Sequence, residues 1–234
     1  MWIKLCGNTN LEDARFAAEC GAQAVGFVFA PSPRRVEADQ VRRITEHLPP
    51  QLEKFGVFVD AGFDEIVSTV NASGLTGVQL HRTSDALLPF RLREHFAGRV
   101  GVLRVLNFMN PEFEHQLKEL SRSEDAVLVD SSTSRAVGGT GTSFDWHKAR
   151  STFLRAAPHL RVVAAGGLSP ENVKQAIQTL RPWGVDVVSG VESAPGKKDP
   201  ARVLAFIRSA QEAAAELQET VAAAKSTNGE EGYS

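Results

Sequence analysis

The sequence predicts a single (β/α)8 barrel, and three observations lead to that fold class. Short apolar runs typical of buried parallel strands alternate with helical segments along most of the 234 residues. Eight such strand–helix units fit the roughly 250 residues typical of this barrel. The competing architecture, an open doubly wound sheet, normally has fewer strands and a G-x-G-x-x-G sequence after the first one, which this chain lacks. We therefore expect one closed parallel sheet rather than two domains.

The expected strands are short apolar runs bounded by turn residues. They cover residues 2–6, 24–29, 54–59, 77–81, 100–106, 126–130, 161–165 and 185–189. The expected helices cover residues 11–20, 38–48, 64–71, 84–96, 111–120 and 145–153, with a seventh after residue 169 and a last one from residue 200. Thr9 and Glu12 match a capping box before the first helix, which Gly21 ends. Ser169, with Pro170 at the first helical position, is expected to cap the seventh helix.

We expect residues 1–214 to form the barrel domain. Beyond residue 214 the chain becomes rich in Ala and Glu, and it ends in a polar segment with few apolar residues to bury. This composition predicts a helical extension and a disordered tail over residues 215–234.

Composition excludes several classes of function. The net charge is −2 with scattered Lys and Arg, so there is no basic patch for nucleic acid or an anionic membrane. No apolar run approaches the roughly 20 residues of a membrane-spanning helix. Two cysteines make neither a disulfide framework nor a zinc site. We expect a cytoplasmic protein with free thiols, a small phosphorylated molecule as its ligand, and a monomer, with a homodimer as the alternative.

Polar residues gather where the expected strands end, which is the ligand-binding side of such barrels. They are Cys6, Arg34, Gln79, His81, Asp130, Gly166, Gly167, Ser189 and Gly190. The glycines after the last two strands favour a phosphate site, because bare backbone N–H groups and a helix N-terminus bind anions there. A glycine pair after a strand is otherwise an ordinary tight turn.

Each polar candidate also has a structural interpretation. Cysteine usually behaves as a small buried hydrophobe, and we assign Cys20 to the core on that basis. The carboxylate of Asp130 can bond loop amides, and His81 can be a satisfied histidine at a strand end. Arg34 and Arg35 are adjacent, so that one of them is expected only to solvate the loop.

Taken in order, the motifs along residues 2–210 resemble those of the phosphoribosylanthranilate isomerases of tryptophan biosynthesis. The motifs are KLCGNT at 4–9, GFVF at 26–29 with SPR at 32–34, VQLH at 78–81, LVD at 128–130, GGTG at 138–141 with FDW at 144–146, AGGL at 165–168 with PENV at 170–173, VDVVSGVE at 185–192 and PGKKD at 195–199. The resemblance implies an Amadori rearrangement that needs neither a cofactor nor a metal.

The resemblance also implies roles for individual residues. Cys6 is then the general base and Asp130 the general acid, while Arg34 contacts the anthranilate group. The glycine loops hold the phosphate, and Asp186 bonds substrate hydroxyls. Gln79 and His81 are expected to face the substrate from their strand end.

Three departures from the family pattern matter. The loop before Ser32 is one residue shorter, which leaves Arg35 as a possible substitute for Arg34. Thr142 and Ser143 replace the usual Lys-Thr, so a cation over the site is missing. The tail has no counterpart in the family pattern.

The chemistry sets requirements on three groups. Asp130 needs a raised pKa to act as an acid, and Cys6 needs a lowered pKa to be a thiolate near neutral pH. Lys4 lies on the inward side of the first strand with Cys6, where it can either bias Cys6 or pair with Asp186. Two rival functions stay open: the related phosphoribosyl-aminoimidazole isomerase of histidine biosynthesis, which is expected to use two aspartates, and a non-catalytic phosphoribosyl-binding barrel.

Overall fold

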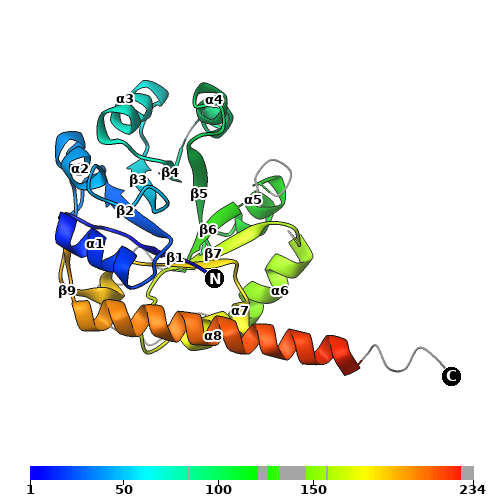
Figure 1. Cartoon of the computed structure of the whole chain (residues 1–234). Coiled ribbons are helices and arrows are strands. Elements are labelled where there is room, and N and C mark those ends of the chain that lie inside the picture. The colour runs from blue at the N-terminus through cyan, green and yellow to red at the C-terminus, as the bar shows by residue number, and fades with distance from the viewer. Residues whose placement is uncertain (84, 121–125, 132–145, 157, 228–234) are drawn as a thin grey trace.

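The computed structural model describes residues 1–83, 85–120, 126–131, 146–156 and 158–227, with side chains up to residue 220. Within this part of the chain, parallel strands β1 to β8 pair in sequence order, and β8 pairs with β1 to close the barrel. Helices surround the closed sheet (Figure 1). The predicted (β/α)8 fold is confirmed.

The barrel strands lie close to their predicted positions. Their bounds are β1 Trp2–Leu5, β2 Ala24–Val28, β3 Glu53–Val59, β4 Gly77–His81, β5 Gly101–Asn107, β6 Ala126–Asp130, β7 Arg161–Ala165 and β8 Gly184–Val187. The sequence placed Ser189 at the end of the eighth strand, which is wrong. It begins the short 3-10 helix η1, Ser189–Val191, which turns the chain at the barrel mouth.

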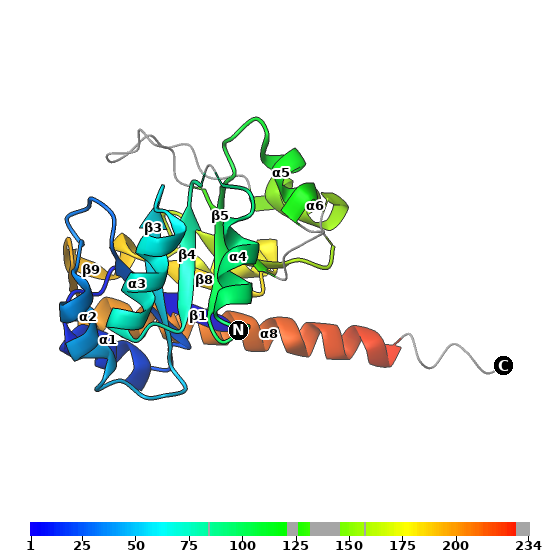
Figure 2. The same cartoon turned by 90° about the horizontal axis from the view of Figure 1, so that it is seen from above.

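The helices cover the outside of the sheet. Their bounds are α1 Leu11–Glu19, α2 Ala38–Thr45, α3 Phe63–Ser73, α4 Leu88–His95, α5 Phe113–Leu120, α6 Trp146–Ala156, α7 Val173–Leu180 and α8 Pro200–Thr227. Helix α8 runs unbroken across the predicted domain boundary between residues 214 and 215, and its end extends past the barrel (Figure 2). No described helix is long and apolar enough to cross a membrane.

One predicted helix cap and one predicted helix start are wrong. Asn10, not Thr9, caps α1, because its Oδ1 accepts a hydrogen bond from the N–H of Asp13 at 2.8 Å. Helix α7 begins at Val173 instead of Pro170. Residues 170–172 form a turn instead, in which Oδ1 of Asn172 accepts a hydrogen bond from the N–H of Ser169 at 2.8 Å.

A two-stranded hairpin follows η1 and was not predicted. It consists of β9, Glu192–Ala194, and β10, Lys197–Lys198, which pair antiparallel. Gly196 at its turn has a φ of +80°, a left-handed conformation that favours glycine. The hairpin contacts the loop before α1, where the Thr9 hydroxyl donates to the carbonyl of Gly196 at 2.6 Å.

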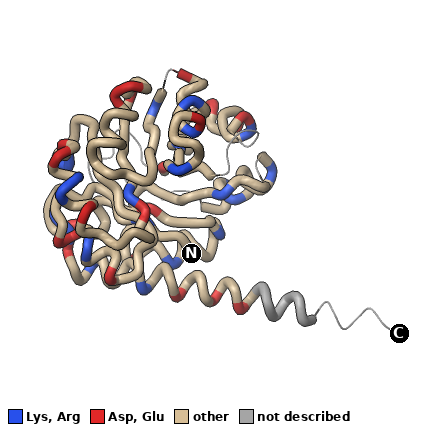
Figure 3. The backbone as a smooth tube through the Cα atoms, turned by 45° about the horizontal axis from the view of Figure 1, so that its top comes forward, with Lys and Arg blue, Asp and Glu red and all other residues tan. Residues whose placement is uncertain are grey.

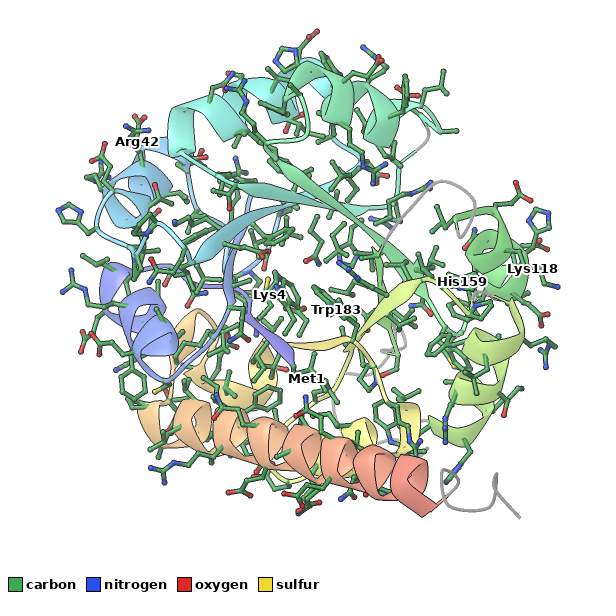
Figure 4. All side chains as sticks on the ribbon, turned by 45° about the vertical axis from the view of Figure 1, so that its right-hand side comes forward. Met1, Lys4, Arg42, Lys118, His159 and Trp183 are labelled. Atoms are coloured by element: carbon green, nitrogen blue, oxygen red, sulfur yellow. The ribbon has the colours of Figure 1, made fainter. Side chains whose placement is uncertain are left out.

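Alternate residues of each strand point into the barrel and fill it in layers. An apolar cluster occupies part of this interior: Trp2, Ala24, Phe55, Leu103, Leu128, Val163 and Ala165. Nearer the carboxyl ends of β1, β4 and β8, the buried residues Lys4, Gln79 and Asp186 are polar. Lys4 lies inside the barrel, while Arg42 and Lys118 lie on outer helices (Figure 4).

Charge on the outside is mixed. Basic and acidic residues are interspersed over the outer helices (Figure 3). Most of the ion pairs there join exposed side chains, such as Arg42–Glu46 and Arg155–Glu114. Such pairs are worth little to stability, so the strongly held charges are those inside the barrel and at its mouth.

Candidate active site

Cys6 directly follows β1 and is held from several sides. Its N–H donates to the carbonyl of Val187 on β8 at 2.9 Å, and its carbonyl accepts from Nζ of Lys198 at 2.5 Å. Gly26 on β2 leaves room for the thiol, because a Cβ built there would lie 2.5 Å from Sγ. Only 3% of Cys6 is exposed, so both its position and its desolvation are set by these neighbours.

Lys4 and Asp186 form a buried ion pair beneath Cys6. They are register partners where β1 and β8 close the barrel, and Nζ lies 2.8 Å from Oδ1. Burial opposes the charge on Lys4, but Asp186 and Cys6 outweigh it and raise the pKa of Lys4. Of the two possibilities left by the sequence, Lys4 pairs with Asp186 and also acts electrostatically on Cys6.

Burial raises the pKa of the Cys6 thiol above its usual value. Lys4 and Lys198 act in the opposite direction without overcoming this effect. The residues around Cys6 therefore do not supply the lowered pKa that a thiolate base requires, because desolvation of the thiolate outweighs the effect of the nearby lysines.

A cavity of about 230 Å³ brings most of the predicted site together. The predicted residues that line it are Cys6, Gln79, His81, Asp130, Gly166, Gly167, Asp186 and Ser189. Burial lowers the pKa of His81, although Asp130 and Asp186 oppose the shift, so the imidazole is neutral at neutral pH. A second cavity of about 600 Å³, between β4, β5 and α5, shares His81 and Asp130 with the first.

The glycine loops after β7 and β8 pack against each other. Gly166 and Gly167 have φ angles of +90° and +66°, which side chains rarely adopt. Gly190 does not line the cavity; a Cβ on it would collide with the carbonyl oxygen of Leu168. Its lack of a side chain allows the two loops to meet, with Ser189 placed at the cavity wall.

Arg34 and Arg35 have different surroundings. Arg34 lies against Gly7, and its Nη2 donates to Oε2 of Glu192 at 2.6 Å; its side chain is 20% exposed. The side chain of Arg35 is 53% exposed and pairs with Glu37 at 3.2 Å. Arg34 is therefore the arginine at the barrel mouth, although it does not line the 230 Å³ cavity.

Sequence reasoning missed three residues around the site: Gly26, Glu192 and Lys198. All three lie in motifs that the resemblance includes, but no role was assigned to them. Glu192 and Lys198 could have been found from the sequence, because these oppositely charged residues lie on either side of the turn sequence Pro195-Gly196. Two features of the sequence lie outside the described residues: the departure from the family pattern at Thr142 and Ser143, and the GGTG motif at 138–141.

The fold and this site define the class of protein. It is a (β/α)8-barrel enzyme in which a buried thiol and a carboxyl group share one cavity at the carboxyl ends of the strands, an arrangement suited to proton transfer. No group of described His, Cys, Asp and Glu residues is placed to hold a metal ion.

Comparison with known proteins identifies the family. The family described as N-(5'-phosphoribosyl)anthranilate (PRA) isomerase matches residues 3–209. The chain therefore belongs to the N-(5'-phosphoribosyl)anthranilate isomerase family. It is 40% identical to the isomerase from Thermotoga maritima over 211 residues, which is 89% of this chain and 98% of the relative. It is 42% identical to that from Trichlorobacter lovleyi over 215 residues, 90% and 98% of the two chains.

Solved structures agree with this assignment. The crystal structure of the Thermotoga maritima isomerase has a TM-score of 0.78 and 39% identity, and covers 91% of this chain and 99% of its own. A phosphoribosyl anthranilate isomerase in complex with reduced 1-(o-carboxyphenylamino)-1-deoxyribulose 5-phosphate has a TM-score of 0.75 and 36% identity, with the same coverage.

Proposed function

We propose that this protein isomerises N-(5-phosphoribosyl)anthranilate to 1-(2-carboxyphenylamino)-1-deoxyribulose 5-phosphate in tryptophan biosynthesis, by general acid and base catalysis. Family membership supports the reaction, and so does the similar structure that holds a reduced form of this compound. The observation that carries the mechanism is that Cys6 and Asp130 line one cavity.

Asp130 is the general acid of the first step. It donates a proton to the ribose ring oxygen as the bond between that oxygen and C1 breaks. The lone pair of the anthranilate nitrogen forms the C1=N bond, which leaves a protonated Schiff base. Without a proton donor the departing oxygen would carry a full negative charge, so a positioned acid is worth about 10²–10⁴ in rate.

Cys6 is the general base of the second step. As a thiolate it removes the proton on C2, the C–H electron pair becomes the C1=C2 bond, and the C=N pair returns to nitrogen. The resulting enaminol tautomerises to the ketone. Because burial raises the pKa of Cys6, the thiolate needs a nearby cation, and the Schiff base formed in the first step supplies one beside Lys4 and Lys198.

The remaining residues bind and orient the substrate. Arg34 binds the anthranilate carboxylate, and Asp186 bonds the ribose hydroxyls. The phosphate is held by the loops after β7 and β8, at Gly166, Gly167, Ser189 and Gly190. His81 and Gln79 face the ribose from β4. Support for Gln79 comes from its buried Oε1, which has no hydrogen-bond partner among the described residues and is satisfied by a substrate hydroxyl.

The fluorescence decay of the anthranilate substrate tests this function in one assay. We expect wild-type protein to convert phosphoribosylanthranilate and to convert the phosphoribosyl-aminoimidazole substrate of histidine biosynthesis at a far lower kcat/KM. An inverted preference would assign the chain to the histidine pathway, and equal kcat/KM values would contradict the proposed selectivity. Absence of turnover on both, with binding retained, would make it a binding protein.

We also propose that the protein is a cytoplasmic monomer with residues 1–214 as its catalytic domain. One similar structure contains monomers generated from the dimeric isomerase of Thermotoga maritima, so a homodimer is the alternative. Size-exclusion chromatography with light scattering distinguishes the two states.

A further inference from the structure

Two buried charges lie beside the site, and neither is assigned a contact with the substrate in the proposed reaction. Glu192 on β9 is 8% exposed and Lys198 on β10 is 3% exposed. They are register partners across the hairpin, with Nζ of Lys198 3.4 Å from Oε1 of Glu192. Buried charges are costly unless paired and bonded, so their contacts call for an explanation.

The carboxylate of Glu192 accepts two hydrogen bonds from one edge of the Arg34 guanidinium. Nε of Arg34 donates to Oε1 at 2.8 Å, and Nη2 donates to Oε2 at 2.6 Å. This side-on pair fixes the plane of the guanidinium. It also leaves the Nη1 edge outside the contact with Glu192, and that edge matches a second carboxylate.

Lys198 connects the same cluster to the catalytic base. Its Nζ donates to the carbonyl of Cys6 at 2.5 Å, while its backbone N–H donates to Oδ2 of Asp13 at 2.9 Å. The backbone of Cys6 and the guanidinium of Arg34 are thus tied to one hairpin through Lys198 and Glu192.

The charges of Arg34, Glu192 and Lys198 together affect how strongly this region attracts an anion. Burial opposes the charge on Glu192, but Arg34 and Lys198 outweigh it and lower its pKa, so the carboxylate stays ionised. Arg34 and Glu192 alone would present a neutral pair to an anion. Lys198 adds a second positive charge beside this pair, although burial lowers its pKa, and that charge favours an incoming carboxylate.

We propose that Glu192 and Lys198 are positioning residues that set the preference for a substrate with an aryl carboxylate. Glu192 holds Arg34 with its Nη1 edge toward that carboxylate. Lys198 adds positive charge beside Arg34 and holds the backbone of Cys6. This inference rests on the proposed function, in which Arg34 binds the anthranilate carboxylate.

The test compares two substrates that differ only in the aryl carboxylate: N-(5-phosphoribosyl)anthranilate and N-(5-phosphoribosyl)aniline. We expect Glu192→Gln to raise KM for the carboxylated substrate about tenfold, with little change in kcat. KM for the aniline substrate stays unchanged. In an Arg34→Ala background, Glu192→Gln has no further effect, because its influence passes through Arg34. Glu46→Gln, which breaks an exposed pair with Arg42, is the matched control.

Equal losses on both substrates, or losses that add to those of Arg34→Ala, would assign Glu192 a merely structural role and overturn the inference. Should Glu192→Gln fail to fold, Glu192→Asp keeps the charge but shortens the reach, and the same selective rise in KM is expected. Lys198→Met is expected to raise KM for the carboxylated substrate and also to lower kcat; unchanged values for both would remove Lys198 from the proposal. If the wild-type protein does not convert phosphoribosylanthranilate, the proposed function fails, and that result is distinct from any of these.

Discussion

The two sides of the 230 Å³ cavity are built differently. On the side of β1 and β8, Cys6 is buried above the Lys4–Asp186 pair. Its N–H donates to the carbonyl of Val187, and its carbonyl accepts from Nζ of Lys198. On the side of β4 and β6, Asp130 is only half-buried and borders the larger second cavity. The difference teaches that position and desolvation are imposed on the base, whereas the acid stays close to water.

The largest expected effect is on stability, at the rigid side. Lys4→Met leaves Asp186 buried without its cation, and we expect it to lower the free energy of unfolding by about 3–5 kcal/mol. Arg42→Met, which breaks an exposed pair with Glu46, is the control and should cost less than about 1 kcal/mol. Urea unfolding measures both. Similar losses in the two variants would show that the barrel interior is more hydrated than the structure indicates.

Gly26→Ala tests whether the position of Cys6, on the same side of the cavity, matters for turnover. Its Cβ would lie 2.5 Å from Sγ of Cys6, so the thiol must move. We expect a fall in kcat of about 10²-fold from displacement of the base and a loss of about 1–3 kcal/mol from overpacking. Gly101→Ala is the control, because a Cβ there meets only ordinary contacts at 3.8 Å or more. Normal turnover in Gly26→Ala would show that the position of the sulfur is not critical.

The raised pKa of Cys6 predicts a dependence on pH. The raised value means that the folded state favours the neutral thiol, so Cys6 contributes stability below the pKa of an unfolded cysteine. That contribution is lost as the pH rises through the folded pKa. Absorbance at 240 nm should show Cys6 ionising above the range of a free thiol in Cys20→Ser protein, and this transition should vanish when Cys6→Ser is added. An inflection below that range would contradict the dominance of burial.

The smallest effect is expected at the carboxyl terminus. Glu216 of α8 still contacts α7, accepting from Nε2 of Gln178 at 2.8 Å, and Leu217 packs on the core. A chain that ends at Gln218 should therefore keep its kcat/KM and lose no more than a few degrees in Tm. A large loss of activity would bring the end of α8 into the catalytic domain, against the proposed boundary at residue 214.

Strands with a regular apolar pattern could be predicted from the sequence. The outcome of competition between neighbouring residues that can each cap a helix could not. The apolar runs that became β4, β6 and β7 were located to the residue, because parallel strands buried on both faces leave a strong pattern. The start of α7 was misplaced because Ser169 and Asn172 both suit a helix start, and the choice depends on which side chain bonds which amide.

The polar groups at the strand ends were predictable for a related reason. Parallel strands bring their carboxyl ends to one face, so residues far apart in sequence, such as Cys6 and Asp130, had to meet there. The hairpin with Glu192 and Lys198 was not predicted, because its strands are too short to show an alternating apolar pattern. The sequence also could not show whether the pKa of Cys6 is raised or lowered, because the shift depends on how deeply the thiol is buried and on how close Lys4 and Lys198 lie to it.

The most direct measurement compares Cys6→Ser and Asp130→Asn in one fluorescence assay, with calorimetric binding of the reduced product analogue. If the two groups act on one substrate from opposite sides of the cavity, each variant loses about 10²–10⁴ in kcat while the Kd of the analogue changes little. Near-normal turnover in either variant would contradict that pairing of acid and base.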